Sequence, residues 1–198
     1  MTTLYASFIA AGADIILTNS FGGTSFRLKL HQAENSVNAL NLAAARLARQ
    51  AADASDKPVL VAGSMGQTGE LFQPLGALTS DAAEQAFSEQ AFALAEGGAD
   101  LLWIETMSSL EEVEAAVKGA RRTNLPVAAT MTFDTAGRTM MGVTPAAYAE
   151  FATSLSLDAF GANCGIGPAE FLNSVHKFKH RKKTSCHRER ELWHPCLC

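Results

Sequence analysis

The stretch Asp158-Ala-Phe-Gly-Ala-Asn-Cys-Gly-Ile-Gly167 carries the strongest fold signal in the chain. A short apolar run ends at Asn163-Cys164, glycines follow, and Pro168 comes next. This order predicts a buried strand, a tight turn and the start of a helix. The unit would place the thiol of Cys164 at the C-terminal end of a strand, where α/β folds keep their binding and catalytic groups.

Earlier parts of the chain repeat this strand-turn-helix unit. Helical patterns separate the predicted strands throughout, and Ala11–Asp14 resembles Gly97–Asp100 just before two of them. Uninterrupted alternation predicts parallel strands joined by right-handed crossovers. The predicted strands start near residues 15, 59, 101, 127 and 158, and the predicted helical regions include 25–52, 81–96 and 109–122.

Two architectures fit this alternation: a doubly wound sheet and a (β/α)8 barrel. No Gly-x-Gly-x-x-Gly opens a helix with a matching acid downstream, so dinucleotide binding is weakly supported. Polar residues recur at strand ends, which favours the barrel, whose site draws on many strand ends. They are Thr18-Asn19, Ser64, Glu105, Asp134 and Asn163-Cys164. A whole barrel takes roughly 250 residues, so we expect an α/β chain that is an incomplete (β/α)8 TIM barrel of about five units.

Composition is ordinary for a soluble globular protein, with 47% hydrophobic and 18% charged residues in 198. No apolar run reaches the ~20 residues of a membrane span, and Met1–Leu4 lacks the basic start of a signal peptide. The sequence therefore predicts a cytoplasmic protein without a membrane partner.

Charge and cysteine content change sharply near residue 176. Residues 176–198 hold seven of the 16 Lys and Arg but two of the 20 acids, and three of the four cysteines. These cysteines do not follow zinc-module spacing, and the basic run lacks the pattern of a nucleic-acid site. We expect a domain over residues 1–175 and a basic, disordered or frame-shifted tail over 176–198, with no nucleic-acid partner.

Cys164 and Glu105 are the two side chains most suited to chemistry. A thiolate at Cys164 could be a nucleophile or a soft metal ligand, although a small buried cysteine is the plain alternative. One thiolate cannot hold zinc, and His31 is expected on the surface. Glu105 ends the apolar run Leu101–Ile104, where a carboxylate would suit the ammonium group of an amino acid.

The Gly63–Gly69 loop allows two interpretations. Its backbone N–H groups could bind a carboxylate or a phosphate, as in an unrelated barrel enzyme that acts on phosphorylated substrates. It could equally be a turn that uses glycine for positive φ. No late glycine-rich phosphate loop is present to support the first alternative.

Five motifs taken in order resemble the homocysteine S-methyltransferase family, from about Leu4 to about Val175. They are Gly12–Thr24, Gly63–Gly69, Asp100–Thr106, Phe133–Thr139 and Gly161–Gly165. Within the family the chain looks most like bacterial betaine–homocysteine methyltransferases, and it is also similar to the homocysteine domain of cobalamin-dependent methionine synthase. The resemblance implies a (β/α)8 barrel, truncated here at both ends, in which zinc keeps the sulfur of L-homocysteine as a thiolate for methyl transfer from a donor.

The resemblance also implies roles for individual residues. Cys164 matches one of three zinc-binding cysteines, and Glu105 matches the glutamate that holds the amino group of homocysteine. Thr18, Asn19 and Ser64 match strand ends near the amino acid. Betaine is the favoured donor, with methyltetrahydrofolate and S-methylmethionine as alternatives.

The family's adjacent cysteine pair is absent from this sequence. With one zinc ligand of three and unpaired strand edges, which promote association, we expect weak activity or an inactive remnant. Formation of a homo-oligomer stays open.

Overall fold

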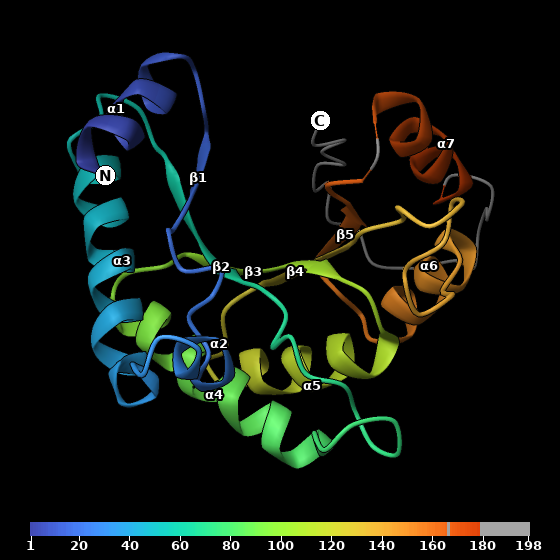
Figure 1. Ribbon diagram of the computed structural model, residues 1–198. Coiled ribbons are helices and arrows are strands. Elements are labelled where there is room, and N and C mark those ends of the chain that lie inside the picture. Colours follow the sequence, from blue (N-terminus) through green and yellow to red (C-terminus); the bar gives the residue numbers. More distant parts are fainter. Residues whose placement is uncertain (166, 179–198) are drawn as a thin grey trace.

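The computed structural model describes residues 1–165 and 167–178, and within them the strands form a five-stranded parallel sheet in the order β1-β2-β3-β4-β5. The chain alternates between strands and helices, as Figure 1 shows. The elements are α1 (Thr2–Ala10), β1 (Ile15–Leu17), α2 (Ser25–Lys29), the 3-10 helix η1 (Glu34–Ser36), α3 (Val37–Asp53), β2 (Leu60–Met65), α4 (Ser80–Glu96), β3 (Leu101–Met107), α5 (Leu110–Arg121), β4 (Val127–Met131), α6 (Pro145–Ser154), β5 (Ala159–Ala162) and α7 (Pro168–Phe178).

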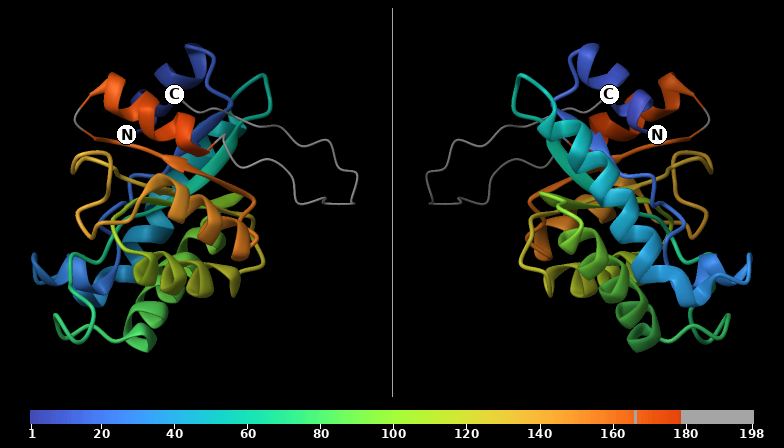
Figure 2. Two further views of the ribbon diagram at one scale, coloured as in Figure 1. Left: turned by 90° about the vertical axis from the view of Figure 1, so that its right-hand side faces the viewer. Right: turned by 90° about the vertical axis from the view of Figure 1, so that its left-hand side faces the viewer.

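The sheet is curved, and α3, α4, α5 and α6 form an arc around its outer side (Figure 1). Sequential parallel neighbours with a helix after each strand are the arrangement of a barrel segment. The predicted α/β class with about five β-α units is therefore confirmed. In the described residues, β1 and β5 are the edge strands. Figure 2 shows α1 close to the C-terminal end of α3, beside the β1 edge.

The two faces of the sheet differ in what they contact. A Cβ atom on Gly63 would lie 3.2 Å from Leu94 of α4, so this side of β2 packs on the helices. Because side chains alternate along a strand, Val61 and Met65 share that buried face, and both are fully buried. Ser64 consequently projects from the opposite, inner face.

Aromatic side chains pack β5 and α7 against α6 and the segment after β4. Tyr148 of α6 is fully buried, and its hydroxyl donates to the carbonyl of Ala129 at 2.7 Å. Burial raises the pKa of this phenol. The ring belongs to a cluster whose centroids lie 5.9–6.3 Å apart, made by Phe133, Tyr148, Phe160 and Phe178.

Several predicted boundaries need correction. The helical region 25–52 is divided, with a turn that contains the exposed His31 between α2 and η1. Gly63–Met65 continue β2 instead of forming a loop, because these residues pair with β3. The helix expected from residue 81 begins at Ser80, and the Thr79 side chain caps it by accepting the Ala82 N–H.

Ser109 caps α5 and Thr144 caps α6, since each side chain accepts an N–H from the first turn of its helix. The helix α7 continues to Phe178, past the predicted boundary after residue 175. The rest of the predicted tail, residues 179–198, lies outside the described residues.

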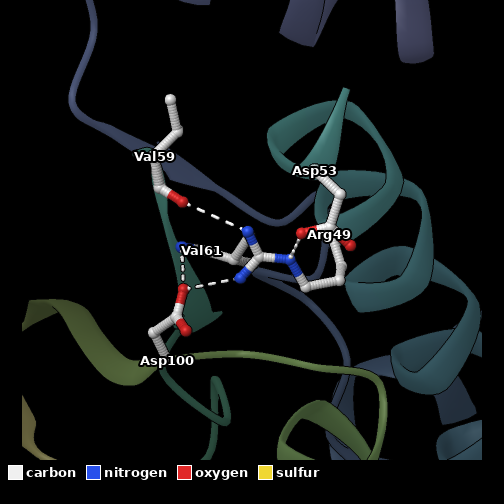
Figure 3. A network of polar contacts seen from close by, with 5 residues as sticks. All are labelled: Arg49, Asp53, Val59, Val61 and Asp100. Carbon is white, nitrogen blue, oxygen red and sulfur yellow. Dashed lines mark hydrogen bonds and ion pairs between the residues drawn. The ribbon is translucent and has the colours of Figure 1, made fainter. Parts of the chain in front are cut away.

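The aspartates before β3 and β5 have a structural role at the amino ends of the strands. Asp100 Oδ2 accepts the Val61 N–H at 2.7 Å and a hydrogen bond from Arg49 at 2.9 Å. Arg49 also donates to the carbonyl of Val59 and pairs with Asp53 (Figure 3). Asp158 accepts the Val127 N–H in the same way. Each of these aspartates thus ties its own strand to the preceding one.

In the part of the chain that the structure describes, no helix has the length and apolar character needed to cross a membrane.

Candidate functional site

A chain of hydroxyl groups links the carboxyl ends of β1, β2 and β3. Thr18 Oγ1 lies 2.6 Å from Ser20 Oγ, and it accepts the Ser64 N–H at 2.9 Å. Ser20 donates to the carbonyl of Ser64 at 2.7 Å. The Ser64 hydroxyl then donates to the carboxylate of Glu105. Thr18 and Ser64 are 4% and 2% exposed, so the half-buried Glu105 is oriented by a buried, rigid support.

A second group of contacts links β3, β4 and β5 around Asn163. Its Oδ1 accepts the Thr106 N–H at 3.0 Å and the Thr130 hydroxyl at 2.8 Å. Its Nδ2 donates to Thr106 Oγ1 at 2.7 Å and lies 3.7 Å from the sulfur of Cys164. Since Glu105 and Thr106 are consecutive, the two groups of contacts meet on β3.

Cys164 follows β5 as an exposed free thiol, so the expected alternative of a small buried cysteine is wrong. Its φ is +57°, and Gly165 follows at +106°. A left-handed backbone is costly for a residue with a side chain and is found preferentially at functional sites. The turn directs the thiol to the surface at the carboxyl edge of the sheet.

Asn19 lies apart from these contacts in one respect. Its side chain is exposed, whereas its backbone N–H donates to the Tyr5 hydroxyl at 3.1 Å. Burial raises the pKa of Tyr5, and the Asn19 hydrogen bond opposes that shift. Ser64 thus contacts both Thr18 and Glu105, and Asn19 and Cys164 lie at the same carboxyl edge of the sheet.

The described residues do not by themselves fit a zinc ion. Residues 1–165 and 167–178 contain no group of three His, Cys, Asp or Glu side chains that could hold a metal. Zinc at a catalytic site takes three protein ligands. Cys164 supplies one sulfur ligand from the described part of the chain.

The glycine-rich loop after β2 uses its N–H groups within the protein. Gly66 donates to the carbonyl of Phe21 at 2.9 Å, and the Thr68 N–H donates to Glu112 at 2.7 Å. A Cβ atom on Gly66 would lie 2.5 Å from the ring of Phe21, so close packing requires glycine there. These contacts favour the interpretation of the loop as a packed turn.

Sequence reasoning missed the role of Glu112. The position in the first turn of α5 suggests an exposed acid that complements the helix dipole. Instead the side chain is buried, and Oε1 accepts both the N–H and the hydroxyl of Thr68 at 2.7 Å. Burial raises the pKa of Glu112, and the hydrogen bonds from Thr68 oppose the shift.

Sequence reasoning also missed Gln90 and Asn41, which hold the loop after β1. Gln90 Nε2 donates to the carbonyl of Ser20 at 2.8 Å and to Asn41 Oδ1 at 3.1 Å. Asn41 donates to the carbonyl of Gly23 at 2.8 Å. A Cβ atom on Gly23 would lie 2.2 Å from Asn41, so only glycine leaves room for this contact. The Gly22-Gly23 pair was therefore the feature of the sequence that indicated a tightly packed loop.

An open hollow among the described residues lies away from these groups. It measures about 750 Å³ and lies between α1 and α3, with Ile9, Ala51 and Lys57 among its lining residues. A small space of about 10 Å³ lies beneath Cys164, lined by Phe133 and Ser174 among others. The candidate site is the carboxyl edge of the sheet, where the polar side chains meet, and not this hollow.

Comparison with known proteins gives a consistent result. The family model described as homocysteine S-methyltransferase matches residues 1–193. A protein of Mycobacterium tuberculosis named methionine synthase is 32% identical over 179 residues, covering 86% of this chain and 15% of that protein. A methionine synthase of Mycobacterium leprae is 31% identical over 192 residues, covering 92% of this chain and 16% of that protein.

Among solved structures, the metallated form of the homocysteine methyltransferase MmuM from Escherichia coli is similar in fold, with a TM-score of 0.73 and 22% identity. The match covers 87% of this chain and 65% of that one. With respect to the two mycobacterial relatives, the chain spans about a sixth of their length. The extent of the family match shows that the chain belongs to the homocysteine S-methyltransferase family.

Proposed function

We propose that this chain forms the homocysteine-binding part of an enzyme that transfers a methyl group to the sulfur of L-homocysteine and so produces methionine. The observation that carries the proposal is the Ser64–Glu105 contact, which orients a half-buried carboxylate at the edge of the sheet that also bears Cys164. Family membership supports it, as do the names of the relatives, methionine synthase and homocysteine methyltransferase.

In this proposal Glu105 binds the ammonium group of the amino acid. Ser64 already donates to one carboxylate oxygen and orients the group toward the inner face. The Thr18 hydroxyl oxygen accepts a hydrogen bond from the backbone N–H of Ser64. Asn19, the next residue, has an exposed side-chain amide. A fixed anion with room for further donors suits a primary ammonium ion, which has three N–H groups.

The chemical step we propose is a direct displacement. The homocysteine thiol first loses its proton to solvent, because the thiolate is the nucleophilic form. Its sulfur then forms a bond to a methyl carbon of the donor while the bond from that carbon to nitrogen breaks. With betaine, our favoured donor, the electron pair returns to nitrogen and leaves dimethylglycine beside methionine.

Methyltetrahydrofolate is the alternative donor that a specific observation favours. Both mycobacterial relatives are named methionine synthase, and each matches more than four fifths of this chain. S-methylmethionine also remains open. A donor series assayed by methionine formation distinguishes the three.

We also propose Cys164 as one ligand of a zinc ion. Its exposure at the strand end and the metallated state of the Escherichia coli relative support this. The remaining ligands would have to come from outside the described residues. A cytoplasmic location, the absence of a nucleic-acid partner and the formation of homo-oligomers stay predictions.

Titration calorimetry with L-homocysteine tests the role of Glu105. E105Q should bind on the order of 10- to 100-fold more weakly, because a hydrogen bond to a charged group contributes roughly 1.5–3 kcal/mol. E70Q is a matched control, since Glu70 is an exposed acid close by on the loop after β2. Equal affinity of E105Q and the unmodified chain would exclude Glu105 as the ammonium site.

A further inference from the structure

Asn163 joins two strands that are not neighbours in the sheet. β4 lies between β3 and β5, so their axes are separated by two strand spacings, or about 9–10 Å. Yet Asn163, directly after β5, makes two hydrogen bonds to Thr106 of β3, at 3.0 and 2.7 Å. The Thr130 hydroxyl of β4 donates to the same amide oxygen at 2.8 Å. The side chain therefore spans the inner face above β4.

The backbone of β3 is adapted to this contact. Its pairing with β4 shifts register between Ile104 and Met107, and Thr106 adopts a φ of +64°. A bulge of this kind re-aims side chains and N–H groups next to a site. Here it points the N–H of Thr106 at Asn163 instead of along the regular ladder.

The Asn163 side-chain amide connects the two strand ends that carry Glu105 and Cys164. Glu105 precedes Thr106, and Cys164 follows Asn163, whose Nδ2 lies 3.7 Å from the thiol sulfur. Any change in the Asn163–Thr106 contact would change the separation between the Glu105 carboxylate and the sulfur-bearing edge. That separation has to match the distance from the ammonium group to the sulfur in the bound amino acid.

We propose that Asn163 is a positioning residue that sets the side-chain length the site accepts, and so selects homocysteine over the shorter cysteine. This proposal rests on the proposed function, in which Glu105 binds the ammonium group and the sulfur lies at the Cys164 edge. Asn163 acts through Thr106, Thr130 and Cys164, and its effect is on selectivity among amino acids.

Titration calorimetry with L-homocysteine and L-cysteine on the 198-residue chain tests this. One missing methylene changes binding by roughly 10- to 200-fold in a matched site, so the unmodified chain should prefer homocysteine by at least about 10-fold. In N163A the preference should fall to about 2-fold, mainly through weaker binding of homocysteine.

T130V serves as a second variant in case N163A does not fold, as judged by circular dichroism. It removes one of the three hydrogen bonds and should reduce the preference to an intermediate value. T132V is the matched control directly after the same strand, because within the described residues the buried Thr132 hydroxyl has no hydrogen-bond partner. It should keep the preference of the unmodified chain.

The outcomes separate the two proposals. An unchanged preference in folded N163A, an equal loss of affinity for both amino acids, or equal behaviour of T130V and T132V would overturn the role of Asn163 and leave the function standing. An unmodified chain that binds neither amino acid would overturn the proposed function, and the role of Asn163 with it.

Discussion

Glu112 is 3% exposed in the first turn of α5, and it holds Thr68 by two hydrogen bonds of 2.7 Å. Burial raises the pKa of this carboxyl group above its ordinary value of 4.5. A group that binds its proton more tightly in the folded protein stabilises the fold fully below the unfolded pKa. That contribution is lost as the pH rises through the folded pKa.

We therefore predict that E112Q changes the pH dependence of stability. The amide oxygen of glutamine can accept both hydrogen bonds from Thr68 but carries no charge. The free energy of unfolding of E112Q, measured in urea, should exceed that of the unmodified chain at pH 7, and the excess should vanish near pH 4. E112A should instead lose about 1–3 kcal/mol at pH 7, because the buried Thr68 N–H loses its partner.

E111Q is the control for this comparison, because Glu111 is an exposed acid in the same helical turn. A parallel pH dependence of E112Q and the unmodified chain would show that the charge of Glu112 costs the fold nothing.

Whole elements are tied together at the amino ends of the strands. Asp100 and Asp158 each accept an N–H from the preceding strand, Val61 and Val127 respectively. Asp14 occupies the equivalent position before β1, where it pairs at 2.8 Å with Lys57 and has an 81% exposed side chain. The three aspartates thus differ in their partners: Asp100 and Asp158 each bond the preceding strand, whereas the exposed Asp14 pairs with Lys57.

The three aspartates predict a graded series of stabilities. D100A should cost about 2 kcal/mol, since it removes hydrogen bonds from both Val61 and Arg49. D158A should cost about 1 kcal/mol for one hydrogen bond. D14A should stay within about 0.5 kcal/mol, as expected for an exposed ion pair. Urea unfolding followed by circular dichroism measures all three, and equal losses would contradict the structural ranking.

At the scale of the molecule, the sheet presents a row of polar groups along its carboxyl edge and one candidate metal ligand, Cys164. Because zinc takes three protein ligands at a catalytic site and the adjacent cysteine pair of the family is absent from this sequence, we predict that the purified chain contains well below one zinc per molecule. Methionine formation from homocysteine and betaine should then be slow or absent. Elemental analysis and mass-spectrometric detection of methionine measure the two quantities.

The control variant C164S should lose the residual zinc if Cys164 binds it. Stoichiometric zinc together with sustained turnover by the unmodified chain would contradict the prediction, and zinc retained in C164S would place the metal elsewhere.

Much of the fold could be predicted because its signals are local. Strand and helix periodicity and the polar residues after apolar runs depend on a few neighbouring positions. The predicted end of β2 was wrong because the local sequence of Gly63–Met65 is typical of a turn. Pairing with β3 makes these residues part of the strand. Glu112 was missed because its partner Thr68 lies 44 positions away in the chain.

The sequence by itself determined the order of strands and helices, and hence a parallel sheet with Thr18, Ser64, Glu105 and Cys164 at one edge. Only the tertiary structure decided which of these side chains meet. The Ser64–Glu105 contact depends on the register of β2 against β3, and the Asn163–Thr106 contact depends on a bulge and on the curvature that brings β5 toward β3. Such contacts join residues 41 and 57 positions apart, where no local pattern records the distance.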